Sequence, residues 1–105
     1  MTDTSRPRHY QMLARNYPRF MEALDGVAQA TRQSGPLEEK TIQLLQLAAA
    51  AALGSETSVS SHAYRASQAG ATPGEICQAL LVLTTTIGFP ATAAALKWAE
   101  KHLEE

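Results

Sequence analysis

The segment from residue 37 to residue 53 constrains the fold more than any other part of the chain, because it is apolar on nearly every side. After Glu38 and Glu39 its apolar residues are Ile42, Leu44, Leu45, Leu47, the run Ala48 to Ala52, and Leu53. A helix without a wide polar face is normally buried on several sides. A chain of 105 residues cannot cover it alone, because so short a chain buries only roughly 60–65 % of its unfolded surface. We therefore predict a homo-oligomer in which another subunit covers part of this helix.

Proline and glycine mark where the preceding helix begins and ends. An apolar stripe recurs at the spacing of one helical face between Pro18 and the break Ser34-Gly35-Pro36, which predicts an amphipathic helix. The members of this stripe are Phe20, Ala23, Leu24, Val27, Ala28 and Thr31. A short additional helix over residues 9–15 comes before it.

The clearest helix start in the chain is Thr72-Pro73-Gly74-Glu75, a capping box with proline at the first helical position. It predicts a helix that runs to Gly88, and we expect the cap to outweigh the β-branched run Thr84-Thr85-Thr86. Pro90 starts the last helix, with Trp98 on its apolar face.

No segment alternates apolar and polar residues with the period of 2 that a half-buried strand requires. The sequence also has no internal repeat, linker or low-complexity tract. We therefore predict an all-α fold, a compact bundle of five to six helices. Residues 1–105 form a single domain, with residues 1–8 as a flexible N-terminus.

Charge and cysteine content exclude several classes of partner. The net charge is −1, and no face collects enough basic residues to bind nucleic acid. The apolar stretch of residues 44–53 is shorter than the roughly 20 residues that a membrane span needs, and the first residues lack the apolar core of a signal peptide. Cys77 is the single cysteine, so no intrachain disulfide forms. These features predict a cytoplasmic protein.

One stretch, from Gly54 to His62, has a chemically suggestive arrangement. Gly54 ends the apolar helix, and Ser55 or Thr57 caps the next one, which stops at Gly70. On that helix the residues that share one stripe are Ser55, Ser58, Val59, His62 and Ala66. Backbone N–H groups at a helix N-terminus favour anions. Two hydroxyls and an imidazole therefore lie on a partly buried face beside an end that can bind an anion.

The order of these motifs resembles the carboxymuconolactone decarboxylase family, including its alkylhydroperoxidase D-like proteins. The residues that carry the resemblance are Glu39-Lys40-Thr41-Ile42-Gln43-Leu44-Leu45, Ser55-x-x-Ser58-x-x-x-His62, Ala69-Gly70-Ala71-Thr72-Pro73-Gly74-Glu75-Ile76 and Ile87-Gly88-Phe89-Pro90. The resemblance extends from about Tyr17 to the C-terminus. Family members are all-helical and assemble as trimers, hexamers or similar rings, so it implies this fold and an oligomer of that kind.

The sequence departs from the family pattern Cys-x-x-Cys-x-x-x-His at the positions that carry redox chemistry. Ser55 and Ser58 stand where the two cysteines fall, and Gln43 stands where the family has a glutamate. A hydroxyl forms no disulfide, and a carboxamide relays no proton. Because His62 is the one relay element left, we predict that the chain is not a dithiol peroxidase. Engineered cysteine-to-serine changes are the alternative, but the Gln43 departure and the retained Cys77 favour natural loss.

Three functions stay open from the sequence. The first is binding of a small carboxylate or lactone, or non-oxidative, lyase-type chemistry on it. His62 would then be the acid–base group, with Ser55, Ser58 and Gln43 lining the pocket. The second is a catalytically silent oligomeric binding or scaffold protein. The third is a family-type, peroxiredoxin-like peroxidase activity through another thiol such as Cys77. Whether the protein is an enzyme is left open.

Each candidate residue also has a purely structural interpretation. Ser55 and Ser58 can serve as helix caps, His62 as an interface histidine, and Gln43 as a buried hydrogen-bonding partner. A Ser58–His62 dyad fits the i, i+4 spacing, but the sequence places no acid to orient the imidazole. Cys77 fits a small core position. The histidines lack the spacing of metal ligands, so we predict no metal and no cofactor.

Overall fold

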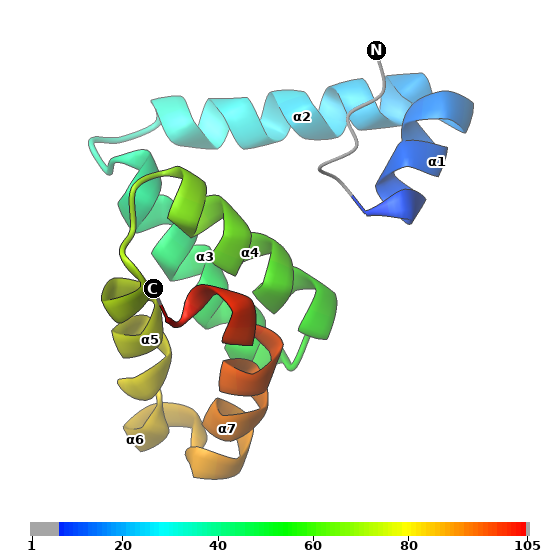
Figure 1. Ribbon diagram of the computed structural model, residues 1–105. Helices are drawn as coiled ribbons and strands as arrows, with labels where there is room; N and C mark the ends of the chain where they lie inside the picture. The colour runs from blue at the N-terminus through cyan, green and yellow to red at the C-terminus, as the bar shows by residue number, and fades with distance from the viewer. Residues whose placement is uncertain (1–6, 105) are drawn as a thin grey trace. The chain divides into compact units, whose positions relative to one another are not determined.

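The structure, a computed structural model, describes residues 7–104, and every regular element in that range is helical (Figure 1). The elements are α1 (Arg8–Asn16), α2 (Pro18–Gln33), α3 (Glu39–Leu53), α4 (Glu56–Gln68), α5 (Pro73–Leu81), α6 (Thr84–Ile87), α7 (Phe89–Trp98) and the 3-10 turn η1 (Glu100–His102). Six of the α-helices span nine residues or more. The predicted all-α fold with five to six helices is therefore confirmed. Within these residues, no helix combines the length and the hydrophobicity needed to cross a membrane.

The chain divides into two compact units, one that ends at Pro36 and one that begins at Leu37. The first unit contains α1 and α2, and the second contains the remaining helices. The predicted single domain over residues 1–105 stays a prediction. Most of the stretch predicted to be a flexible N-terminus, residues 1–8, lies outside the described residues, and Arg8 already belongs to α1.

In the first unit, α2 begins at Pro18 as predicted and packs against α1 through few buried side chains. Met21 is the buried residue of α2, and none of α1 is buried. The predicted apolar stripe of α2 is exposed, with Phe20 57 % and Val27 62 % accessible. The helical spacing of the stripe is therefore present, but the described residues of the first unit do not cover it.

In the second unit, α3 and α4 form a tight hairpin and lie side by side (Figure 1). Gly54 ends α3 with φ 71°, a left-handed conformation that glycine adopts without steric cost. Ser55 follows at once as the N-cap of α4. Both predicted boundaries are confirmed, and the short connection brings the two helices together as antiparallel neighbours.

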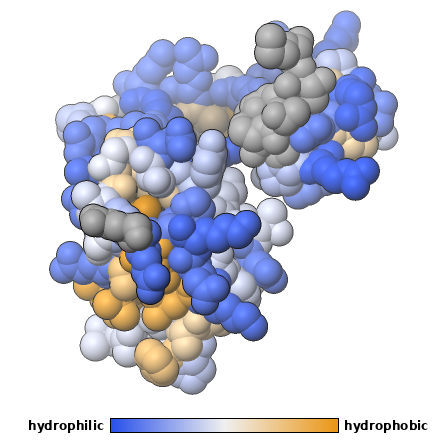
Figure 2. Space-filling view, in the orientation of Figure 1, coloured by the Kyte–Doolittle hydropathy of each residue, from blue (hydrophilic) through white to orange (hydrophobic). Residues whose placement is uncertain are grey.

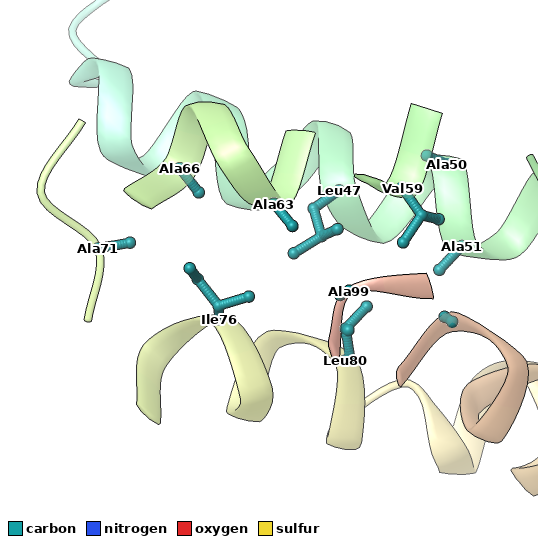
Figure 3. Close-up of a cluster of buried hydrophobic side chains, with 11 residues drawn as sticks. Leu47, Ala50, Ala51, Val59, Ala63, Ala66, Ala71, Ile76, Leu80 and Ala99 are labelled. Carbon is teal, nitrogen blue, oxygen red and sulfur yellow. The ribbon is translucent and has the colours of Figure 1, made fainter. Parts of the chain in front are cut away.

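The core of this unit lies between the α3–α4 hairpin on one side and α5 and α7 on the other (Figure 3). Leu47, Ile76 and Leu80 point into it and are fully buried. Burial of such a side chain contributes roughly 1.5–3 kcal/mol. The small residues on α3 and α4 that complete the core are Ala50, Ala51, Ala63 and Ala66. These alanines let the two backbones approach closely, and this fixes how α4 faces α3.

The apolar helix α3 is covered on one broad side. Gln43, Leu47, Ala50 and Ala51 are its buried residues. Leu45 and Leu53, in contrast, are exposed, with 83 % of Leu53 accessible. The described residues of the second unit therefore leave part of this helix without cover.

The helix that follows the capping box is shorter than predicted. Instead of running to Gly88, α5 ends at Leu81, and α6 is a separate turn. At the break, the Leu83 N–H donates to the carbonyl of Leu80 and the Thr86 N–H to that of Leu83, each three residues back. The prediction of a continuous helix is wrong: the cap acts on the first turn only, and the break falls at Val82 and Leu83, before the threonines, which themselves belong to the turn α6.

Candidate functional site

The candidate motif occupies the N-terminal part of α4, on the side that packs against α3. The buried residues of α4 are Val59, Ala63 and Ala66. Ser55, Ser58 and His62 are half-buried and lie at the border of the same face. Of the three, His62 reaches α3, through its hydrogen bond to Gln43.

His62 is held by a hydrogen bond that crosses from α4 to α3. Its Nδ1 lies 2.8 Å from Oε1 of Gln43. Gln43 is 3 % exposed, and its amide Nε2 donates to Oε2 of Glu39 at 2.6 Å. A buried amide therefore stands between a carboxylate and an imidazole, and both of its polar atoms are engaged. Gln43 is the buried hydrogen-bonding partner that its structural interpretation predicted.

Glu39 is the third member of this row of hydrogen bonds, and its contact with Gln43 was not predicted from the sequence. From the sequence it had no role beyond its place in the motif that starts at residue 39. Its spacing of four residues from Gln43 was the available signal, because side chains at i and i+4 are neighbours on a helix. The sequence placed no acid near His62. In the structure Glu39 supplies one, connected to His62 through the amide of Gln43.

Ser55 acts as a helix cap. Its Oγ accepts a hydrogen bond from the backbone N–H of Ser58 at 3.4 Å. This is a long hydrogen bond, and such bonds stabilise weakly. His62 makes a hydrogen bond to Gln43 on α3. The Ser58–His62 dyad stays a prediction.

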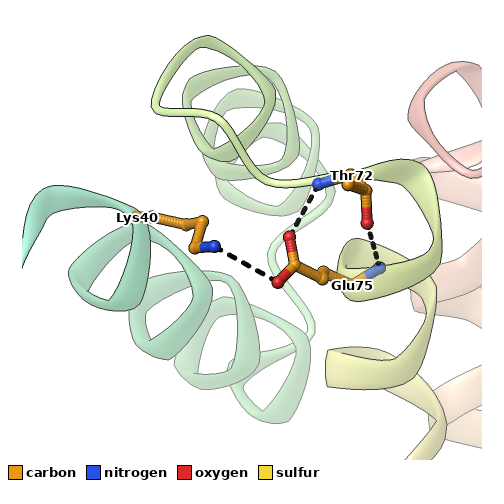
Figure 4. Close-up of polar contacts among 3 residues, drawn as sticks. All are labelled: Lys40, Thr72 and Glu75. Atoms are coloured by element: carbon orange, nitrogen blue, oxygen red, sulfur yellow. Dashed lines mark hydrogen bonds and ion pairs between the residues drawn. The ribbon is translucent and has the colours of Figure 1, made fainter.

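A second polar cluster joins the start of α3 to the start of α5 (Figure 4). The Lys40 ammonium lies 3.2 Å from Oε2 of Glu75. Oε1 of Glu75 accepts the Thr72 N–H at 2.9 Å, and the Thr72 hydroxyl accepts the Glu75 N–H at 3.1 Å. The hydrogen bond from the Thr72 backbone, followed by the Lys40 ammonium, holds the pKa of Glu75 below its ordinary value. The predicted capping box is confirmed and also carries an ion pair.

The remaining thiol and histidines lie elsewhere. Cys77 is a free, half-buried cysteine on α5, less enclosed than the core position predicted for it. His9 stacks against Tyr10, and the ring of His102 meets that of Tyr64 edge-on at 6.1 Å. In the described part of the chain, no three His, Cys, Asp or Glu side chains gather as a metal site would require.

An open groove of about 590 Å³ belongs to the first unit. Its lining residues are Ala14, Pro18, Met21, Glu22, Asp25, Gly26 and Gln29. None of the predicted site residues is among them.

Comparison with known proteins identifies the family of the chain. The profile of the carboxymuconolactone decarboxylase family matches residues 18–101, which is most of the sequence. Comparisons with curated proteins and with solved structures find no match. The matched range includes α2 to α7 and with them the whole hydrogen-bonded chain from Glu39 to His62. The polypeptide therefore belongs to the carboxymuconolactone decarboxylase family.

Proposed function

We propose that the protein binds a small carboxylate or lactone at the contact of α3 and α4, or acts on it non-oxidatively, with His62 as the acid–base group. The observation that carries this proposal is the 2.8 Å hydrogen bond between buried Gln43 and His62. It fixes the orientation of an imidazole at a half-buried position, as a general acid or base requires. Histidine is the side chain that most often serves as a general acid or base.

The groups around His62 favour non-oxidative chemistry. The side chains at the two motif positions are the hydroxyls of Ser55 and Ser58, which form no disulfide. Cys77, the single thiol of the sequence, lies on another helix. A peroxidase would consume hydroperoxide with a dithiol reductant and lose this activity in Cys77→Ala; we expect no such consumption.

The N-terminus of α4 favours the proposal that the ligand is negatively charged. The α4 helix has 13 residues, and its first backbone N–H groups point out of the helix beside Ser55. Together with the helix dipole, such groups attract carboxylates and other anions. Ser58 and His62 follow on the same side, so the ligand is expected to meet the helix end, a hydroxyl and an imidazole in succession.

A thermal-shift screen against small carboxylates and lactones tests the proposal. A ligand at a hundred times its dissociation constant adds about 2.7 kcal/mol to the stability of the folded protein. For a chain of this size that corresponds to a rise in Tm on the order of 10 °C. We expect at least one ligand to give such a shift and His62→Ala to abolish it.

The matched control is His102→Ala, which removes a half-buried histidine in η1. It should leave the ligand response intact. If no ligand in the panel stabilises the protein, or if His62→Ala responds as well as the parent, the proposed site is wrong.

A second candidate is a catalytically silent oligomer that serves as a binding or scaffold protein. The exposed stripe of α2 and the exposed residues of α3 support the oligomeric part of this candidate, because monomers rarely leave large apolar residues exposed in rows.

We propose that the chain forms a homo-oligomer, a trimer or hexamer, through these faces. Light scattering should then give three or six times the chain mass, and Val27→Glu should reduce it. A monomeric parent protein would contradict the proposed assembly.

A further inference from the structure

The hydrogen-bonded chain from Glu39 to His62 determines more than the position of the ring. We propose that Glu39 is a positioning residue that, through Gln43, keeps the hydrogen of the neutral His62 ring on Nδ1 and the lone pair on Nε2. This inference rests on the proposed function only in naming Nε2 as the acid–base atom of the site.

The argument starts at the carboxylate. An ionised carboxylate has hydrogen-bond acceptors only. Oε2 of Glu39 lies 2.6 Å from the Gln43 side chain, so the atom facing it must be the amide nitrogen, which donates. The amide has one nitrogen and one oxygen, so its oxygen must face the other way, towards His62.

The second step follows at the imidazole. The Gln43 oxygen accepts hydrogen bonds and does not donate them, and it lies 2.8 Å from Nδ1 of His62. Nδ1 must therefore carry the hydrogen. In the neutral ring the other nitrogen, Nε2, then holds the lone pair. Free histidine in water prefers the opposite tautomer, with its hydrogen on Nε2, so the protein imposes this arrangement.

Burial makes the orientation of the amide hard to reverse. Gln43 is almost fully buried between α3 and α4. Turning the amide over would set its oxygen against the Glu39 carboxylate, so that two hydrogen-bond acceptors would face each other beside a buried amide, which is unfavourable. The neutral amide passes no proton along the chain. Glu39 therefore acts by fixing an orientation and does not take part in a proton relay.

The experiment is to read the tautomer of His62 by 15N NMR of the unliganded protein above the pKa of the ring. The sequence has only three histidines, His9, His62 and His102, so His62→Ala assigns the signal. In the parent protein we expect a protonated, pyrrole-type Nδ1 and a pyridine-type Nε2. Glu39→Lys offers a donor in place of an acceptor, which should turn the Gln43 amide over and exchange the two 15N signatures. Glu39→Ala should give an intermediate mixture of tautomers.

The matched control is Glu38→Lys, which makes the same charge change at the exposed N-cap of α3, one residue away. It should leave both nitrogen signals of His62 where they are. The proposal is overturned if the parent carries its hydrogen on Nε2, if Glu39→Lys leaves the tautomer unchanged, or if Glu38→Lys changes it equally. Because no ligand is present, failure of the ligand screen and failure of this test are separate results.

Discussion

Glu39 and Lys40 are neighbours in the first turn of α3, yet each begins a polar chain of a different kind. Successive residues of a helix point roughly 100° apart, so the two side chains leave α3 in different directions. Glu39 leads through Gln43 to His62 on α4. Lys40 leads through Glu75 to the cap of α5 (Figure 4). One helix turn thus anchors two of the elements that pack against α3, namely α4 and α5.

The two chains differ in their middle and last members. The Lys40 chain joins opposite charges and ends on the backbone of Thr72, where the capping hydrogen bonds are reciprocal. The Glu39 chain passes through a buried neutral amide and ends on a titratable ring. The Lys40 contacts therefore hold two helices together, whereas the Glu39 contacts orient a side chain that can titrate. The two sets of contacts differ in function because one ends on a backbone N–H and the other on an imidazole ring.

The largest expected loss of stability comes from replacing Gln43, the buried residue between Glu39 and His62. Gln43→Leu removes both hydrogen bonds and leaves Nδ1 of half-buried His62 without its amide partner. We expect a loss of about 1–3 kcal/mol, the usual cost of a polar group deprived of its partner. Urea unfolding measures the loss. Gln78→Leu, the same change at an exposed position of α5, should alter stability by only about 0.5 kcal/mol or less, and equal losses in both variants would contradict the buried role of Gln43.

Breaking the other chain at its cap should have a smaller effect. Thr72→Ala removes the hydroxyl that accepts the Glu75 N–H, and loss of an N-cap side chain costs about 1 kcal/mol. The 15N signals of His62 should not change, because this chain does not reach α4. Thr57→Ala, an exposed threonine in the first turn of α4, is the control. A shift in the His62 tautomer in Thr72→Ala would show that the two chains are coupled.

The smallest effect is the pH dependence carried by Glu75. Its pKa is lowered in the folded protein from the ordinary value of 4.5. The resulting stabilisation is therefore fully present above pH 4.5 and is lost as the pH falls through the lowered pKa. Thermal melts at pH 7 and at decreasing pH below 4.5 should show Glu75→Gln converging with the parent. Added salt should reduce the difference at pH 7, because both partners are partly exposed. A difference that stays constant down to pH 3 would contradict this account.

The features that the sequence predicted well are those decided within a few residues. The capping box needs only Thr72 and Glu75, and the end of α3 needs only Gly54 and its left-handed conformation. The inward stripe of α4 follows in the same way from helical spacing. Such features depend on local geometry, and neighbouring elements change them little.

The features that were missed have no local signal or depend on distant contacts. The end of α5 at Leu81 lies well beyond the first turn, where the cap has no influence, and no local signal at Val82 and Leu83 marks the break. The role of Glu39 required knowing that Gln43 faces α4. The helical stripe of α2 was correct, but spacing alone does not say what covers it. The hydrogen bond between Gln43 and His62 joins two residues that the sequence had named as candidates, whereas the hydrogen bond from Gln43 to Glu39 was not predicted.

The cap formed by Ser55 has a consequence for anyone who would engineer thiol chemistry into this fold. Serine is among the preferred N-cap residues, whereas a cysteine sulfur is a weak hydrogen-bond acceptor. A cysteine at this position would gain a nucleophile and weaken the start of the helix that carries it. A redesign that installs a cysteine pair here should therefore strengthen the first turn of α4 in the same step, or the gain in reactivity will come with a frayed helix end.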